Sequence, residues 1–391
     1  MLFFTEARLY QTEDKKHYAA DQSSSYRMFK RYLSVFDRVL VVARVATGFQ
    51  YRANESTRVD NAGVEVLPLP HYIGPHQYLK TRNKLLLSLR SYIDSRPEAA
   101  MICRLPGTIG TAAARYLVKK KRPYGVEVVG DPLDVFASGS FSHPLRPVLR
   151  HIFSRDLKIV IKKAAASIYV TKATLQKRYP PANNQFSTYS SNVMLPPDAF
   201  VRVAKRLKRE PPYSIVTVGT LDAMYKSPDV AIEAMALLKK KGLNVALQWV
   251  GNGRYRDEMI ARAQEAGVAD RVNFVGNVGS AQDVRGYLDS ADLFLLPSRT
   301  EGLPRAMVEA MARGLPCIGT KIGGIPELLD ESALVPVNDP RSLAEKIELF
   351  LTTPGLADAQ ASRNLQEAQC YAFERLEARR KDFYHYLKSV S

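Results

Sequence analysis

The second half of the chain alternates between short apolar runs and amphipathic stretches, and this alternation constrains the fold most strongly. The apolar runs each end at Gly, Pro or Thr, and they span residues 213–219, 244–251, 271–276, 291–297 and 316–320. The amphipathic stretches span residues 229–241, 255–266, 281–290 and 305–313. Predominantly apolar runs are typical of strands buried on both faces of a parallel sheet. The alternation therefore predicts an α/β fold with a doubly wound sheet, whose ligands bind at the carboxyl ends of the strands.

The first half alternates in the same way, with longer irregular pieces. Candidate strands span residues 2–5, 38–43, 63–67, 99–103, 125–129 and 166–170, and candidate helices span residues 18–35, 77–92, 108–121 and 145–163. A chain of 391 residues is long enough for two such domains. Proline pairs at 196–197 and 211–212 bracket a basic run that suits a hinge. We expect a first domain over 1–195, a linker over 196–212, a second domain over 213–364 and a C-terminal helix, 365–391, that packs on the first domain.

Basic residues concentrate in the first half of the chain. Residues 1–200 contain 30 Lys and Arg against 15 Asp and Glu, a net charge of +15, whereas residues 201–391 contain 26 against 24, a net charge of +2. This asymmetry indicates that the first domain faces an anionic partner, unless the basic surface serves only solubility. A nucleic-acid-binding protein is one alternative, but the sequence shows neither aromatic-studded basic strands nor a recognition helix. We therefore expect no nucleic-acid partner.

The cysteines and the N-terminus indicate the compartment. Cys103, Cys317 and Cys370 are too few and too widely spaced to indicate a disulfide framework or a zinc site. The N-terminus is apolar for only four residues, which is not typical of a secretory signal. No apolar run approaches the ~20 residues that span a bilayer. We therefore expect a cytoplasmic protein.

The most informative segment is 297–316, PSRTEGLPRAMVEAMARGLP, which follows a candidate buried strand. Pro304 suits the first turn of a helix, and a glycine is placed to end it. Free backbone N–H groups at such a helix start attract phosphate. Glu301 falls in the loop and Glu309 lies about one and a half turns into the helix, so the two carboxylates can reach different parts of one ligand. The alternative interpretation of Glu301 is a simple N-cap acid, and that of Glu309 is an ordinary acid on the helix surface.

The spacing Glu301-x7-Glu309 in this segment resembles the signature of GT-B-fold retaining glycosyltransferases of family 4, the glycosyl transferases group 1. Three further segments resemble that family in the same order along the chain: 219–221 with Lys226, 250–253, and the GG-x-PE segment 323–327. The resemblance covers the second domain, and the first domain matches loosely. It implies the GT-B architecture, in which two Rossmann-like domains face each other across a cleft. The donor binds in the second domain and the acceptor in the first.

The resemblance also implies roles for single residues. Lys226 and Glu301 are the expected catalytic residues, because Lys226 would hold the diphosphate and Glu301 would lie beside the donor sugar. Glu309 would accept hydrogen bonds from the ribose, and the loop 276–279 would lie near the base. The other expected donor-binding residues are Gly219, Thr220, Gly251, Asn277, Val278, Gly302, Leu303 and Pro304.

The sequence departs from the family pattern at two places. The phosphate-binding Arg that commonly follows the first-strand glycine is Thr220 here, so Lys226 must supply most of the positive charge, helped by an Arg that the sequence does not identify. The Gly-rich loop near the N-terminus is missing, and residues 22–25 occupy that region. Asp131 is the candidate first-domain contact to the sugar, with a turn-forming Asp-Pro as the alternative.

These residues predict a mechanism without a cofactor or metal. Lys226 and the helix-start amides would stabilise the charge that develops on the leaving β-phosphate, and no D-x-D motif occurs in the chain. The sequence offers no convincing nucleophile, which favours front-face transfer with retention over a covalent intermediate. We expect transfer of a hexosyl unit from a UDP-sugar, with a GDP-sugar as the second choice. A glycosidase, a non-catalytic GT-B scaffold that binds nucleotide sugars, and a GT-B phosphorylase or epimerase are the alternatives.

The basic first domain suits a glycan or a polyprenyl-diphosphate-linked glycan as acceptor. Such an acceptor indicates bacterial surface polysaccharide biosynthesis at the cytoplasmic face of the membrane. The predicted helix 145–163 carries an apolar stripe flanked by Arg and Lys. A basic amphipathic helix of this kind can lie on an anionic membrane, although such a stripe also packs on its own sheet. We therefore expect a peripheral contact with an anionic membrane surface through the first domain.

Overall fold

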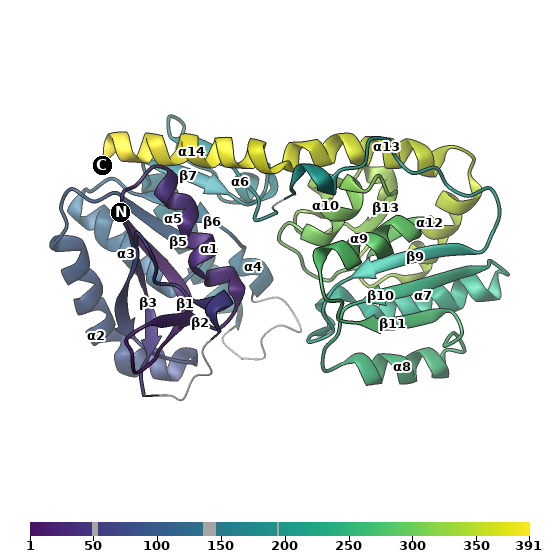
Figure 1. The fold of residues 1–391 in the computed structure, drawn as a ribbon, viewed down its shortest axis with the longest axis horizontal. Coiled ribbons are helices and arrows are strands. Elements are labelled where there is room, and N and C mark those ends of the chain that lie inside the picture. The colour runs from purple at the N-terminus through teal and green to yellow at the C-terminus, as the bar shows by residue number, and fades with distance from the viewer. Residues whose placement is uncertain (49–53, 136–145, 194) are drawn as a thin grey trace. The chain divides into compact units, whose positions relative to one another are not determined.

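The computed structural model describes residues 1–48, 54–135, 146–193 and 195–391. The chain forms two compact units, each built on a mainly parallel sheet flanked by helices (Figure 1). Unit 1 contains the described residues up to Ser190 together with Glu377–Ser391, and unit 2 contains Ser191–Leu376. The predicted α/β class with two Rossmann-like units is confirmed.

Unit 1 is built on an eight-stranded sheet. Its strands are β1 (Leu2–Gln11), β2 (His17–Ala19), β3 (Val39–Ala46), β4 (Val64–Pro70), β5 (Met101–Leu105), β6 (Gly125–Val128), β7 (Ala166–Tyr169) and β8 (Phe186–Tyr189). Seven of them run parallel in the order β4-β3-β1-β5-β6-β7-β8, and β2 pairs antiparallel with β1. Most of these strands are rich in apolar residues, and the first half of β1 together with β3 and β5 is almost entirely buried.

Helices cover both faces of this sheet (Figure 1). The helices of unit 1 are α1 (Tyr26–Phe29), α2 (Gly74–Asp94), α3 (Thr108–Lys120), α4 (Pro132–Val135), α5 (Arg146–Lys163), α6 (Thr174–Arg178) and the larger part of α14 (Phe373–Val390). One core cluster joins α2, α3 and α5 to the sheet through buried residues such as Leu85, Leu117 and Val160. A second cluster joins Tyr32 and the α14 residues Phe383 and Leu387 to the opposite face.

The helix predicted over 18–35 is wrong. The segment contains β2, a 3₁₀ turn (Gln22–Ser24), the single turn α1 and a second 3₁₀ stretch (Lys30–Ser34). Short polar side chains bond to the nearby backbone here: Ser23 N donates to Asp21 Oδ1 at 2.8 Å, and Ser25 Oγ donates to the Gln22 carbonyl at 2.9 Å. Such bonds compete with helix formation, so the apolar spacing of the segment was misleading.

Unit 2 is built on a six-stranded, fully parallel sheet in the order β11-β10-β9-β12-β13-β14. The strands are β9 (Tyr213–Val218), β10 (Val245–Val250), β11 (Val272–Gly276), β12 (Leu293–Leu296), β13 (Cys317–Thr320) and β14 (Leu334–Val335). The helices are α7 (Pro228–Lys240), α8 (Arg256–Glu265), α9 (Ala281–Ser290), α10 (Arg305–Ala312), α11 (Ile325–Leu328), α12 (Pro340–Thr352) and α13 (Leu356–Ala368). The five strands predicted for this half, and the four helices predicted between them, are present within a few residues. The two-residue β14, the helices α11 and α12 and most of α13 were missed.

The C-terminal segment is two helices rather than the single helix predicted from residue 365. Helix α13 ends at Ala368, a 3₁₀ turn holds the fully buried Tyr371, and α14 begins at Phe373, whose N–H donates to the Leu195 carbonyl at 3.0 Å. The segment 196–212 lies within unit 2, where Val201 N donates to the Ala312 carbonyl at 3.0 Å. This segment therefore packs against the end of α10.

Helix α14 fits into unit 1 because β6 begins with a glycine. A Cβ atom at Gly125 would lie 2.8 Å from Phe383 Cζ and 2.9 Å from Leu387 Cδ2, closer than carbon atoms approach. Phe383 is fully buried, and its ring centroid lies 5.8 Å from that of Tyr384 in an edge-on arrangement. The close packing of α14 on the sheet therefore depends on these aromatic side chains.

Truncating Phe383 tests this packing. We expect Phe383→Ala to lower the free energy of unfolding of unit 1 by about 3–5 kcal/mol, because it leaves a cavity under α14. Denaturant unfolding followed by circular dichroism reports both units, whereas fluorescence of Trp249, which is buried in unit 2, reports that unit. Val390→Ala is the matched control on the same helix, since Val390 is 37% exposed. Equal stability of the two variants would contradict this packing role.

Candidate functional site

Four loops of unit 2 follow the carboxyl ends of neighbouring strands. They follow β9, β10, β12 and β13, and they carry all the segments that resemble the group 1 family. The strand order reverses at β9, which has β10 on one side and β12 on the other. Loops after adjacent strands separate at such a switch point, and ligands of doubly wound sheets bind there. The topology therefore gathers the predicted motifs at one edge of the sheet.

Lys226 and Glu301 meet in an ion pair at this edge. Lys226 Nζ lies 2.5 Å from Glu301 Oε1, and the two side chains are 12% and 8% exposed. Ser298 Oγ donates to the same carboxylate oxygen at 2.7 Å. Two residues 75 positions apart are thus held together, although the sequence predicted their roles and not their contact. Burying either charge alone would be costly, so each compensates the other.

Two glycines after β13 support the Glu301 loop. A Cβ atom at Gly323 would lie 1.8 Å from the Glu301 carbonyl oxygen, and one at Gly324 would lie 2.5 Å from that of Gly302. Gly323 also has a φ of +55°, a region that disfavours side chains. Gly324 N donates to the Gly302 carbonyl at 2.7 Å. The backbone of the Glu301 loop therefore packs directly on a glycine backbone.

The loops after β9 and β10 pack against each other in the same way. A Cβ atom at Gly251, where φ is +138°, would lie 2.1 Å from the Gly219 carbonyl oxygen. The Thr220 hydroxyl lies 2.7 Å from Asp222 Oδ2 and 3.2 Å from the Asn252 carbonyl. Gly219 leaves room for the side chain of Lys226, whose Cγ would lie 3.3 Å from a Cβ there. The threonine that replaces the family's arginine thus bonds to its own loop and to the loop after β10.

The start of α10 offers free backbone N–H groups. Pro304 is the N-cap residue in an extended conformation, and no side chain caps the helix. The orphan donors of the first turn therefore begin at Arg305, because Pro304 has no N–H. Gly302 is exposed and Leu303 half-buried in the preceding loop. This arrangement suits an anion such as a diphosphate.

Glu309 lies on α10, one turn beyond that helix start, and is half-buried. Burial raises the pKa of its carboxyl group, and the charges of Arg305 and Arg285 oppose that shift only in part. Among the residues that the structure describes, none forms a hydrogen bond or ion pair with this carboxylate, and Arg285 pairs with Asp198 instead. Its acceptor capacity is therefore free for a ligand.

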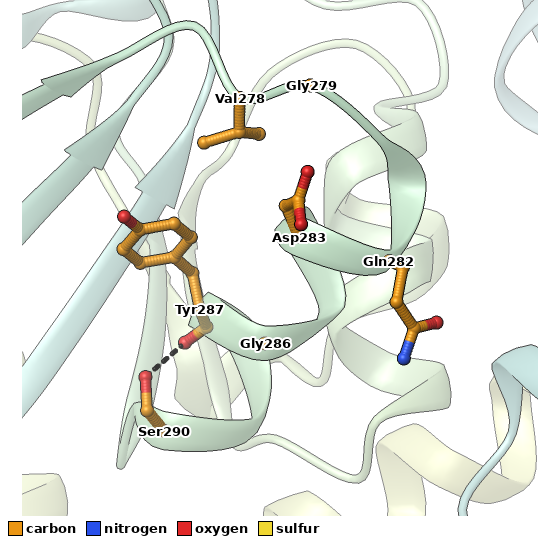
Figure 2. A pocket seen from close by; sticks show the side chains of 7 residues that line it. All are labelled: Val278, Gly279, Gln282, Asp283, Gly286, Tyr287 and Ser290. Atoms are coloured by element: carbon orange, nitrogen blue, oxygen red, sulfur yellow. Dashed lines mark hydrogen bonds between the residues drawn. The ribbon is translucent and has the colours of Figure 1, made fainter.

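A hollow of about 510 Å³ lies beside the loop after β11 and along α9 (Figure 2). Its lining residues are Val278, Gly279, Gln282, Asp283, Gly286, Tyr287 and Ser290. Figure 2 shows Val278 and Asp283 near the loop and the ring of Tyr287 one turn further along the helix. Val278 was predicted to lie near the base, and Asn277 directly precedes it in the same loop. An aromatic ring with polar neighbours suits a planar heterocycle.

Asp131 lies in unit 1 and is 4% exposed. The Tyr179 hydroxyl donates to its Oδ1 at 2.5 Å, Arg178 forms an ion pair with its Oδ2, and Leu133 N donates to its Oδ1 at 2.8 Å. The carboxylate therefore holds the start of α4. This role agrees with the alternative interpretation of Asp131, in which it forms a turn with the proline that follows it. Its contact with a donor sugar stays a prediction.

Sequence reasoning missed Arg299, two residues before Glu301. Its guanidinium forms a bidentate pair with Asp229, with N–O distances of 2.9 and 2.7 Å, and donates to the Met224 carbonyl at 2.8 Å. Burial raises the pKa of the Asp229 carboxyl, but the hydrogen bonds and charge of Arg299 outweigh it and leave the pKa below its usual value. The only signal in the sequence was its place within the 297–316 motif.

No three or more His, Cys, Asp or Glu side chains of the described residues gather closely enough to hold a metal ion. Among the described helices, none combines the length and the apolar composition that crossing a membrane requires.

Comparisons with known proteins agree with this geometry. Residues 201–367 match the family model for glycosyl transferases group 1. CapJ of Staphylococcus aureus is 26% identical over 370 residues, 94% of this chain and 91% of that protein. The putative colanic acid biosynthesis glycosyltransferase WcaL of Escherichia coli is 38% identical over 148 residues, about a third of each chain (36%).

A solved structure, Anabaena HepE in complex with UDP, superposes with a TM-score of 0.63 at 16% identity, over 97% of this chain and 98% of that one. At this identity the likeness shows the fold alone. The family model, in contrast, covers the four loops and the ion pair described above. Residues 201–367 therefore belong to the glycosyl transferases group 1, within a chain that has the GT-B fold.

Proposed function

We propose that this protein is a retaining, metal-independent glycosyltransferase that moves a hexosyl unit from a nucleotide sugar to a glycan acceptor. The single observation that carries the proposal is the Lys226–Glu301 pair beside the uncapped start of α10. Lys226 has three N–H donors, so it can hold a diphosphate while it keeps its bond to Glu301. A hydrolase acting on glycosides needs no such phosphate site.

The transfer breaks the bond between the sugar C1 and the β-phosphate oxygen and forms a bond between C1 and the acceptor oxygen. Lys226 and the N–H groups at the start of α10 stabilise the charge on the departing diphosphate. In front-face transfer the acceptor proton passes to that phosphate oxygen, so no enzymic nucleophile is needed. Glu301 orients the hydroxyls of the donor sugar, and Glu309 accepts hydrogen bonds from the ribose.

The donor is proposed to be a UDP-sugar, with a GDP-sugar as the second choice. HepE, which shares the fold, was crystallised with UDP. The resemblance to the group 1 family also supports this preference. The hollow along α9 would take the base, stacked against Tyr287 (Figure 2).

The acceptor is proposed to be a glycan, or a polyprenyl-diphosphate-linked glycan, in bacterial surface polysaccharide biosynthesis at the cytoplasmic membrane face. The name of WcaL supports such a pathway, since that protein is named for colanic acid biosynthesis. The basic surface of unit 1 supports an anionic acceptor or lipid. On α5, Ile152 and Ile159 are each 47% exposed, whereas Leu157 and Val160 pack on the sheet. Leu145, the first residue of the predicted helix, lies outside the described residues.

A thermal-shift screen against UDP, GDP, ADP and TDP and their sugar conjugates tests the proposed donor site. A ligand at about 100 times its dissociation constant adds ~2.7 kcal/mol of stability. We expect a selective shift that EDTA does not change. The absence of a shift with every nucleotide would contradict the donor site, and a shift that EDTA abolishes would contradict metal independence.

Glu309→Ala is expected to weaken nucleotide binding, because the ribose hydroxyls lose their acceptor. The ionised carboxylate is the acceptor, so wild-type affinity should fall as the pH drops through the pKa of Glu309. Since burial raises that pKa above its usual value, the loss begins at a higher pH than for an ordinary glutamate. Isothermal calorimetry at several pH values measures this effect. Glu309→Gln is the control variant, because its side chain has no ionisable group and its affinity should not follow that pKa. Unchanged affinity in Glu309→Ala would remove the ribose assignment.

Lys226→Ala is expected to lower turnover by about 10²-fold or more, because the leaving diphosphate loses its main cation. Steady-state kinetics with the donor found in the screen measures this loss. Lys240→Ala, at an exposed position of α7, is the control for loss of a lysine in the same unit. Near-normal turnover in Lys226→Ala would mean that another cation stabilises the leaving group.

Contact with an anionic membrane is tested by vesicle co-sedimentation. The exposed Lys158 and Lys162 flank Ile159 on α5, and each cation near an anionic surface is worth about 1 kcal/mol. We expect Lys158→Glu combined with Lys162→Glu to weaken binding to phosphatidylglycerol vesicles by about tenfold or more. Lys240→Glu, on α7 of unit 2, should leave binding to these vesicles unchanged. Failure of the wild type to bind such vesicles would exclude this membrane contact.

A further inference from the structure

Lys226 lies in a strained turn between β9 and α7. The turn Met224–Lys226 is a 3₁₀ stretch, and the next residue, Ser227, has φ 55° and ψ 53°. A left-handed conformation is unfavourable for a residue with a side chain, and it persists only where surrounding contacts enforce it. Ser227 is fully buried, and no described residue bonds to its hydroxyl. Its own side chain therefore does not hold the turn in place.

Arg299 provides the contacts that hold the turn. Its backbone N–H donates to the Tyr225 carbonyl at 2.7 Å, and its Nη1 donates to the Met224 carbonyl at 2.8 Å. The bidentate pair with Asp229 ties the same guanidinium to the first turn of α7, on the other side of Lys226. Arg299 thus bonds to the chain both before and after the lysine.

The same guanidinium is itself held in place. Its Nε donates to Asn338 Oδ1 at 2.7 Å, so described residues engage each of its three nitrogens. The Arg299 side chain is 28% exposed and that of Asp229 is 14% exposed. The pair is therefore more shielded from water than a surface ion pair, which contributes little. A lysine could keep the charge but not this set of directed bonds.

Arg299 also belongs to the loop that carries Glu301, two residues further on. One side chain therefore links the loop of Glu301 to the turn of Lys226, close to where those residues meet at 2.5 Å. We propose that Arg299 is a positioning residue, whose guanidinium fixes the Lys226 turn so that the amine lies against Glu301 and the diphosphate site. This inference rests on the proposed glycosyltransferase function.

The test combines single and double variants. Arg299→Ala keeps the backbone bond to Tyr225 and removes only the guanidinium. Arg299→Ala should lower kcat/KM about 10- to 100-fold, the effect of a displaced catalytic group. Arg299→Lys should be impaired nearly as much. In a chain that already carries Lys226→Ala, the further change Arg299→Ala should cost less than about threefold, because groups that act through one another are not additive.

Arg313 is the matched control. It forms a bidentate pair with Asp289 in the same unit, at 2.7 and 2.8 Å, and donates to the Ala199 carbonyl at 3.2 Å. Arg313→Ala should leave kcat/KM within about threefold of the wild type and should add its effect fully to that of Lys226→Ala. Equal effects of Arg299→Ala and Arg313→Ala, or full additivity of Arg299→Ala with Lys226→Ala, would overturn the positioning role.

A second readout does not depend on turnover. Acetylation of lysines by acetic anhydride, mapped by mass spectrometry, measures the accessibility and nucleophilicity of Lys226 in the folded protein. Release of the turn in Arg299→Ala should raise acetylation of Lys226 severalfold relative to Arg313→Ala, and unchanged acetylation would overturn the inference. A wild type that binds and turns over no nucleotide sugar contradicts the proposed function instead, whereas the labelling result still decides the role of Arg299.

Discussion

The ion pair between Lys226 and Glu301 is the interaction on which the site of unit 2 depends. Both side chains are nearly buried, so each charge needs the other to offset its loss of water. The pair joins the loop after β9 to the loop after β12, the two strands that adjoin at the switch point of the sheet. A ligand that arrives there meets a preorganised cation, an acidic acceptor and the free N–H groups of α10.

Close backbone packing places the two charges. Gly251 lets the loop after β10 touch the loop after β9, and Gly323 lets the segment after β13 touch the Glu301 carbonyl. A single methyl group at either position would collide with backbone atoms, which cannot move aside as a side chain can. The glycines, the strained Ser227 and Arg299 therefore serve one purpose, which is to hold two loops in one arrangement. The strain at Ser227 is typical of sites that bind or react.

The sequence predicted unit 2 well because its strands and helices follow simple patterns. Buried strands such as β12 are continuous apolar runs, and α10 begins directly after a proline and ends two residues before a glycine. The helix predicted over 18–35 failed because the Asp21 and Ser25 side chains bond to backbone groups of nearby residues, a local effect that apolar spacing does not reveal. The break before α14 was missed because Tyr371 packs through tertiary contacts, which the amphipathic pattern of the segment did not show.

The site residues were predicted from motifs, and their contacts were not. Glu301 and Lys226 stand in separate motifs, and only the strand order makes them neighbours. Arg299 resembles any exposed arginine in the sequence, since its four bonds reach Met224, Asp229 and Asn338, residues far from it along the chain. Asp131 looked available for a ligand, yet Tyr179 and Arg178 engage its carboxylate within unit 1. Long-range pairing of polar groups is therefore what sequence patterns leave open.

Hydrogen exchange of the whole chain, with and without a saturating nucleotide sugar, locates the donor most directly. Bound diphosphate should slow exchange of the amides in 219–227 and 302–307, and the base should slow those in 277–283, because ligand contacts protect these loops. Such protection would place the donor at the Lys226–Glu301 pair. Protection that appears only in unit 1, or binding without protection of these three loops, would contradict that placement.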